Sequence, residues 1–205
     1  MTRRRETPAE GRARRAAVDD PAAVLDAAAR FLEVRPRSID EVRRRLREAG
    51  YRADLVDGAI ERLAELGMLD DGAFARAWVE SRDRARPRGG RALRSELRRK
   101  GVSGALIAEV MGEREAASME TGQAGDPPSA GDPPSAGDRA SSDSADDVAA
   151  ARLLARRGGA AAREADLRRR RAKAYALLAR HGFDPDVAGR ALATWMAEAV
   201  PIAEE

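Results

Sequence analysis

The arginines, one pair of aspartates and a single histidine are the residues of this 205-residue chain that could do chemistry. Asp70 and Asp71 are adjacent carboxylates that could bind Mg²⁺, but no third ligand follows nearby. His181 is the one histidine and there is no cysteine, so the sequence offers neither a nucleophile pair nor a Cys/His metal site. No P-loop, dinucleotide fingerprint or HExxH motif occurs. We therefore expect a protein that is not an enzyme, with no metal and no cofactor.

Arginine makes up 36 of the 38 basic residues. This ratio indicates either a G+C-rich coding bias or an arginine-lined surface that faces phosphates or acidic protein partners. We expect a partner-binding surface at nine positions: Arg35, Arg37, Arg43, Arg44, Arg82, Arg88, Arg91, Arg94 and Arg98.

Helices must position these side chains. Aromatic residues are only 3% of the chain, so a core rests on Leu, Ala, Val and Ile, which suits small helical modules better than a sandwich or barrel. Ser38 and Glu41 have the spacing of a capping box, in which the hydroxyl accepts one free N–H and the carboxylate returns to the cap. Gly50 is placed to end the helix that this box begins.

The stretch from Glu65 to Arg82 joins two helical units. Gly67 is placed to end one helix and Asp70 to cap the next. On that next helix, four residues share one face at helical spacing: Phe74, Ala77, Trp78 and Ser81.

Three segments of the chain superimpose. They begin at Leu46, Leu97 and Leu178 and read LREAGYRADLVDGAI, LRRKGVSGALIAEVM and LARHGFDPDVAGRAL. Each contains a helix end, a glycine, an apolar residue, a polar cap and a new apolar stripe, and the glycines are Gly50, Gly101 and Gly182. The pattern predicts an all-α tandem array of three three-helix repeats, elongated and curved.

The expected organisation has six segments. Residues 113–147 carry a net charge of −7, and residues 124–138 read AGDPPS twice with a partial third copy. Proline pairs and glycines remove helix and strand options, so we expect a linker whose deletion leaves folding nearly unchanged. The segments are a disordered basic tail (1–20), repeat 1 (21–67), repeat 2 (68–112), a disordered acidic linker rich in Pro, Gly and Ser (113–146), repeat 3 (147–199) and a short tail (200–205).

Composition also bears on location. No apolar run approaches the roughly 18 residues of a membrane span, and no apolar core follows the positive charges of the N-terminus. The absence of cysteine fits a reducing interior. We expect a cytoplasmic protein with no membrane partner.

The motifs of the first two repeats resemble those of the RecX family of recombinase regulators. The resemblance covers residues 22–112 well, and 147–197 only through the HGF turn and its flanks. The family's opening motif, R-x-R-S-x-x-E-(apolar), is matched by Arg35, Arg37, Ser38, Glu41 and Val42. Its joint, L-D-D-x-x-F-A, is matched by Leu69, Asp70, Asp71, Phe74 and Ala75. Its second repeat, G-x-x-x-(I/L)-x-x-E-L-x-x-K-G-(I/V), is matched by Gly89, Leu93, Glu96, Leu97, Lys100, Gly101 and Val102.

The resemblance implies a monomeric regulator that binds the RecA recombinase filament on single-stranded DNA. Such a protein would lie in the helical groove of the filament and inhibit its ATPase, strand-exchange and coprotease activities, and so modulate recombination, DNA repair and the SOS response. Single-stranded DNA would be a further contact within the filament.

A helix-turn-helix regulator that acts on DNA directly is the alternative. Three-helix units with glycine turns resemble that motif. Three such units rather than one, and no obvious dimerisation helix, count against it. Tight, sequence-independent DNA binding that falls steeply with salt would favour it.

Overall fold

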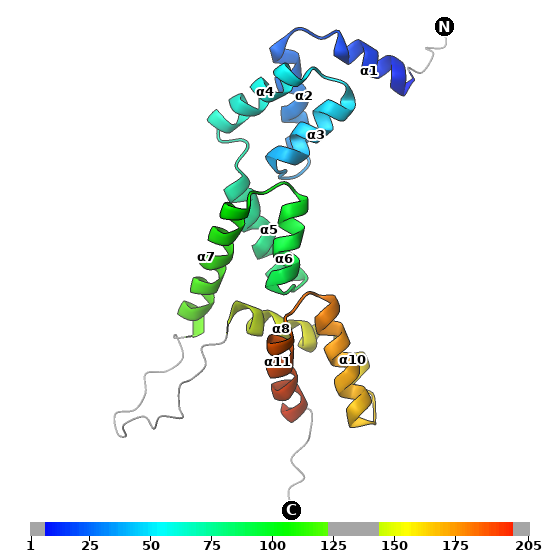
Figure 1. Ribbon diagram of the computed structural model, residues 1–205, viewed down its shortest axis with the longest axis vertical. Helices are drawn as coiled ribbons and strands as arrows, with labels where there is room; N and C mark the ends of the chain where they lie inside the picture. The colour runs from blue at the N-terminus through cyan, green and yellow to red at the C-terminus, as the bar shows by residue number, and fades with distance from the viewer. Residues whose placement is uncertain (1–6, 123–143, 199–205) are drawn as a thin grey trace, which may run out of the picture. The chain divides into compact units, whose positions relative to one another are not determined.

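The computed structural model describes residues 7–122 and 144–198, which form eleven helices and no strand (Figure 1). This confirms the all-α fold of three-helix repeats. The helices are α1 (Pro8–Ala16), α2 (Pro21–Glu33), α3 (Ile39–Ala49), α4 (Ala53–Glu65), α5 (Asp71–Ala85), α6 (Gly90–Arg99), α7 (Gly104–Gly122), α8 (Ala145–Arg157), α9 (Gly159–Ala162), α10 (Leu167–Arg180) and α11 (Pro185–Glu198).

The chain divides into two compact units, and the division passes through the second repeat. One unit holds residues 1–77 and 97–107, and the other holds residues 78–96 and 108–205. The expected repeat boundaries do not coincide with these units and stay a prediction.

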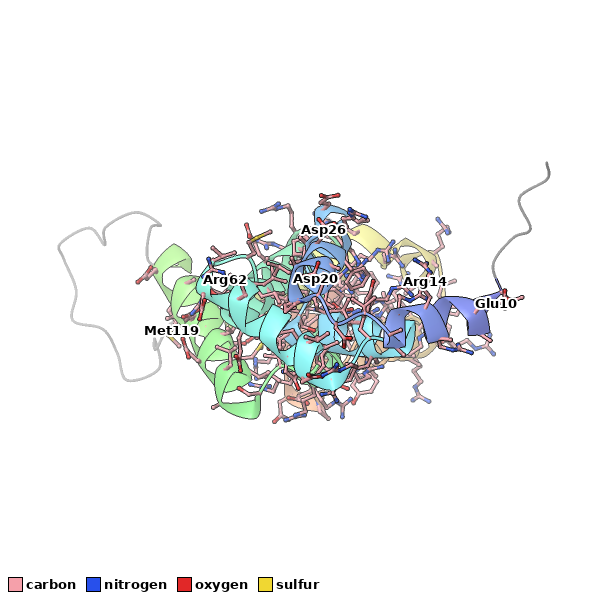
Figure 2. All side chains as sticks on the ribbon, turned by 90° about the horizontal axis from the view of Figure 1, so that it is seen from above. Glu10, Arg14, Asp20, Asp26, Arg62 and Met119 are labelled. Carbon is pink, nitrogen blue, oxygen red and sulfur yellow. The ribbon has the colours of Figure 1, made fainter. Side chains whose placement is uncertain are left out.

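In the first unit, α2, α3 and α4 enclose an apolar core. Asp20 caps α2 through the Ala22 amide, and Pro21 occupies the first turn, where its missing N–H costs nothing (Figure 2). The core residues recur at helical spacing on all three helices. They are Val24, Ala28, Val42, Leu46, Val56, Ala59, Ile60 and Leu63, with Leu69 from the segment before α5.

The expected disordered tail at 1–20 is wrong for residues 8–16, because these residues form α1. Thr7 and Glu10 make a full capping box, and Pro8 lies at the helix start. The Nε of Arg15 donates to the carbonyl of Ala49 at 2.5 Å, which holds α1 to the end of α3. The segment has no apolar periodicity, so the expectation missed a helix that is defined by its cap and this contact.

In the second unit, α8, α10 and α11 enclose the other apolar core. Its largest fully buried side chain is Phe183, in the turn between α10 and α11. Ser144 caps α8, and the short α9 adds a fourth helix to the expected three. The remaining core residues are Ala149, Ala150, Leu153, Leu154, Ala161, Ala174, Leu178, Ala188, Ala191 and Leu192.

The expected linker at 113–146 is too wide at both ends. Helix α7 continues to Gly122, and α8 begins at Ala145 rather than at 147. The AGDPPS copies and the rest of residues 123–143, like the expected tail at 200–205, lie outside the described residues.

Candidate partner-binding surface and the joints between repeats

The two adjacent aspartates of the joint stabilise structure. Oδ1 of Asp70 accepts the amides of Gly72 and Ala73 at 2.7 and 3.1 Å, as an N-cap does. Asp71 accepts the amide of Ile39, 32 residues away, at 2.9 Å. Within residues 7–122 and 144–198, no group of three His, Cys, Asp or Glu could hold a metal ion. In the same residues no helix is long and apolar enough to cross a membrane.

The first joint connects the start of α3 to the end of α6 and the start of α5. Ser38 is fully buried, and its hydroxyl donates to the carbonyl of Lys100 at 2.5 Å while it accepts the amide of Glu41 at 3.2 Å. The Asp71 carboxylate satisfies the free amide of Ile39, at the first position of α3. Burial raises the pKa of Asp71, and the neighbouring Asp70 and Asp40 add to that effect.

Glu41 links three segments at this joint. Its carboxylate accepts the amide of Ser38, pairs with the Lys100 ammonium at 2.7 Å and lies 3.4 Å from Arg35. Burial pushes the pKa of Glu41 up, but hydrogen bonds from Lys100 and Ser38 outweigh it and lower the pKa. Glu41 is therefore charged at neutral pH.

Close packing completes the first joint. Gly101, with φ +80°, ends its helix so near α3 that an added Cβ would lie 2.2 Å from the Cβ of Asp40. Gly50, at φ +105°, ends α3 in the same left-handed conformation. The other motif residues of this region, Leu69, Phe74, Ala75 and Leu97, are buried.

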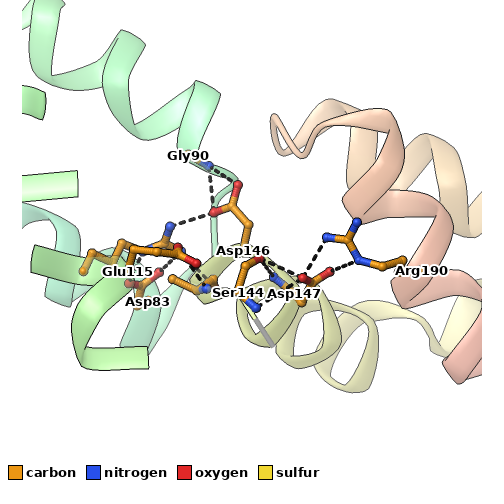
Figure 3. A network of polar contacts seen from close by, with 9 residues as sticks. Asp83, Gly90, Glu115, Ser144, Asp146, Asp147 and Arg190 are labelled. Carbon is orange, nitrogen blue, oxygen red and sulfur yellow. Dashed lines mark hydrogen bonds and ion pairs between the residues drawn. The ribbon is translucent and has the colours of Figure 1, made fainter. Parts of the chain in front are cut away.

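The second joint repeats this arrangement within the other unit. The amide of Gly89 donates to the carbonyl of His181 at 3.1 Å, as the Ser38 hydroxyl does to Lys100. The amide of Gly90, at the start of α6, donates to Asp146, as Ile39 does to Asp71 (Figure 3). Gly182, with φ +80°, is so close that an added Cβ would lie 2.4 Å from the Cβ of Ala92.

Arg114 forms the polar centre of the second joint. Its guanidinium binds both oxygens of Asp83 at 2.8 and 3.0 Å, Asp146 at 2.6 Å and the carbonyl of Ala145. Only 7% of the Arg114 side chain is exposed. Glu115 accepts the amide of Ala145 beside it. The sequence interpretation missed Arg114, Glu115 and Asp146 because it assigned them to the linker. The Asp146-Asp147 pair, similar to Asp70-Asp71, was the available signal.

Of the nine predicted contact arginines, two converge on Glu96 of α6. Arg82 binds the Glu96 carboxylate at 2.9 Å and lies 4.2 Å from the centre of the Trp78 ring. The indole of Trp78 donates to the same oxygen at 2.9 Å. The Nε of Arg88 lies 3.6 Å from Glu96, beyond hydrogen-bond distance, and has no hydrogen-bond partner within the described residues. These side chains form one network, so Glu96 compensates much of their charge.

Four further contact arginines lie in or before α3. Arg35 faces Glu41, Arg43 binds Asp57 at 3.1 Å, and Arg44 lies 3.5 Å from Asp40. Arg37 lies with its guanidinium 4.2 Å from the centre of the Phe31 ring, and burial lowers its pKa. Three of the four are therefore paired with carboxylates.

The last three, Arg91, Arg94 and Arg98, are exposed on α6. Arg91 and Arg94 are one helical turn apart, and Arg98 lies in the last turn. No carboxylate in the described part of the chain pairs with them.

The structure adds a basic groove that the sequence did not predict. It lies between α1, α2 and α3, with the Phe31 and Tyr51 rings among its walls. The guanidinium of Arg45 lies 5.8 Å from the centre of the Phe31 ring. The Thr7–Glu10 spacing and Pro8 were the sequence signals for α1, which supplies a wall of the groove. The basic side chains that line it are Arg12, Arg15, Arg30 and Arg45.

Known protein families match the first and second repeats of this chain. The family model described as the first three-helix domain of RecX matches residues 25–63, and that of the second matches residues 70–111. A regulatory protein RecX from Pelodictyon phaeoclathratiforme is 37% identical over 92 residues, which are 45% of this chain and 58% of that protein. The one from Prosthecochloris aestuarii is 36% identical over 99 residues, 48% of this chain and 66% of that protein. This chain thus spans about three fifths of the length of these relatives.

Solved structures extend the likeness in fold to the third repeat. The crystal structure of RecX from Lactobacillus salivarius has a TM-score of 0.60 and 18% identity, and the match covers 87% of this chain and 98% of that one. A second crystal structure of a regulatory protein RecX has a TM-score of 0.62 and 18% identity, over 83% and 71% of the two chains.

Proposed function

Because this chain belongs to the RecX family, we propose that it binds a RecA-type recombinase filament on single-stranded DNA and inhibits it. The relatives are named regulatory proteins, and the proposed inhibition covers ATP hydrolysis, strand exchange and coprotease activity. The observation that carries the proposal is the pair of family matches, at residues 25–63 and 70–111, on either side of the first joint.

The joints support a mechanism in which successive repeats contact successive filament subunits. Each joint fixes the start of one repeat's middle helix against the next repeat through a backbone amide, an aspartate and a close glycine contact. Repeats that are each joined to the next in this way can offer equivalent contact surfaces to a repeating partner. We propose repeats 1 and 2 as the minimum recognition unit, with single-stranded DNA as an additional contact.

Arg91 and Arg94 are the contact residues that we propose first. They are exposed and lack the carboxylate partners that compensate Arg35, Arg43, Arg44 and Arg82. An exposed guanidinium that no carboxylate neutralises is available to bind an acidic side chain or a phosphate of a partner.

The first test is the ATPase activity of RecA on single-stranded DNA with the full-length protein titrated in. We expect inhibition at amounts well below one molecule per RecA subunit. Binding to bare single-stranded DNA is measured alongside at two salt concentrations. Inhibition only where the protein coats free DNA, with binding that falls steeply with salt, would contradict the filament proposal and favour the direct DNA-binding alternative.

The second test reverses charge at Arg91 and Arg94. The double variant R91E/R94E should raise the half-inhibitory concentration about tenfold or more, since losing two exposed contacts costs about 1.4 kcal/mol or more. The matched control is R168E/R171E on α10, which has the same spacing, exposure and charge change. Equal losses in both variants would mean that only net charge matters.

A further inference from the structure

A small basic pocket in the second unit lies apart from the nine predicted contact positions, except for Arg88. It is lined by the segment between α5 and α6, by α8 and by the end of α10. Its volume of about 130 Å³ is roughly ten times what one water molecule needs. The lining residues are Ala85, Arg86, Pro87, Arg88, Leu153, Arg156, Arg157 and His181.

The residues that line this pocket carry an excess of positive charge. Four of its eight lining residues are arginines and none is acidic. The nearest compensation is Glu96, 3.6 Å from the Nε of Arg88, and that buried nitrogen has no hydrogen-bond partner within the described residues. Arg156 uses one nitrogen for the carbonyl of Arg84 at 2.7 Å, which leaves its charge unneutralised. Several cations in a confined space repel one another unless an anion joins them.

The pKa of His181 is sensitive to this excess of positive charge. Its Nδ1 lies 2.8 Å from the carbonyl of Leu177; a carbonyl can only accept, so Nδ1 carries the proton. Burial lowers the pKa of His181, and the charges of Arg88, Arg157 and Arg180 lower it further, against the Leu177 hydrogen bond. An anion in the pocket would offset both effects and favour the imidazolium form.

We propose that this pocket binds a phosphate group, held by Arg88, Arg156 and Arg157 with His181 at its edge. Guanidinium groups match phosphate oxygens in charge and geometry, and each provides two donors in a plane. Rigid surroundings favour this ligand, because Pro87 is fully buried and Leu153 is part of the α8 core. The inference does not depend on RecA binding.

The single histidine makes the test specific. The imidazole signal of His181 is followed by NMR in the full-length protein, in chloride buffer, while inorganic phosphate is added at constant ionic strength. The signal should shift to saturation, and a pH titration with saturating phosphate should give a higher pKa for His181 than one in chloride. A signal that responds equally to chloride would overturn the proposal.

Variants locate the site. R157Q should weaken phosphate binding about tenfold, since it removes a charge-assisted hydrogen bond to the phosphate. The matched control is R152Q, an exposed arginine on the same helix that does not line the pocket. Circular dichroism checks that both variants fold. Equal weakening in both variants, or none in R157Q, would count against the pocket.

A final pair of titrations identifies the source of the phosphate. A single-stranded oligothymidylate and a mononucleotide are added in turn to the wild type and to R157Q. A response to the oligonucleotide that R157Q loses supports a backbone phosphate, whereas a response to the mononucleotide or phosphate alone supports a free phosphate. No response of His181 to any phosphate compound would refute the proposal.

Discussion

At the residue scale, Gly101 combines two requirements that only glycine meets. Its φ of +80° lies in the left-handed region, and an added Cβ would lie 2.2 Å from the Cβ of Asp40. Gly67 shares the first requirement without the second, because it has φ +67° and open space around a Cβ position. A comparison of the two positions therefore distinguishes the cost of backbone strain from the cost of a steric clash.

We predict that G101A destabilises the protein more than G67A. G67A should cost about 1–2 kcal/mol, the strain of a left-handed alanine. G101A adds a clash with an atom near the α3 backbone, which brings the cost to about 2–4 kcal/mol. Urea unfolding followed by circular dichroism measures both. Equal losses would mean that α3 moves away from Gly101 without cost.

The sequence predicted contacts between residues close in the chain better than contacts between distant residues. The Ser38–Glu41 box and the Asp70 cap depend on neighbours within three residues, so spacing alone indicates them. The bond from Ile39 to Asp71 spans 32 residues, and no local pattern encodes it. The same holds for the contact arginines: spacing placed Arg82 on the surface, but its pairing with Glu96 depends on how α5 packs against α6.

At the element scale, the helical face predicted for α5 was partly wrong. Phe74 is buried and Trp78 half-buried, but Ala77 and Ser81 are exposed, and Ala75 and Val79 are buried instead. The prediction gave α5 a single apolar stripe. The buried positions are instead set by the helices that pack around it, which a sequence pattern alone does not specify.

The polar centre of the second joint gives an element-scale prediction. Arg114 connects α7 to the end of α5 through Asp83 and to the start of α8 through Asp146. R114M should lower the free energy of unfolding by about 3–5 kcal/mol, because it leaves the partly buried carboxylates of Asp83 and Asp146 without their cationic partner. Thermal and urea unfolding measure the loss.

The control for this prediction is R190M on α11. Arg190 binds Asp147 at 2.8 Å, but its side chain is 55% exposed, so the variant should cost about 1 kcal/mol or less. A small loss in R114M, similar to that in R190M, would mean that water replaces the guanidinium between Asp83 and Asp146.

At the scale of the whole molecule, the repeat pattern was predictable and its exact ends were not. The glycines at 50, 101 and 182 mark equivalent turns, and all three have positive φ. The ends of the acidic segment were misplaced because composition does not distinguish a charged helix from a linker: residues 113–122 are polar yet continue α7. Tertiary contacts such as the ion pair of Arg114 with Asp146 connect α7 to α8, and no local pattern in the sequence encodes them.

This correction reverses an expectation about deletion. Removing residues 113–146 takes away Arg114, Glu115 and Asp146, and with them the amide partner of Gly90 at the start of α6. We now predict that this deletion destabilises the protein by several kcal/mol, since it removes a buried ion-pair network and a helix-start hydrogen bond.

The matched control deletes one AGDPPS copy, residues 130–135, which removes none of the described contacts. It should leave the urea midpoint within the range of an ordinary surface change, whereas the long deletion should shift the midpoint strongly. If the long deletion unfolds at the wild-type midpoint, the contacts of Arg114 and Asp146 contribute nothing to the packing of the third repeat. The second joint would then depend on the close contacts of Gly89 and Gly182 and on the hydrogen bond from the Gly89 amide to the carbonyl of His181.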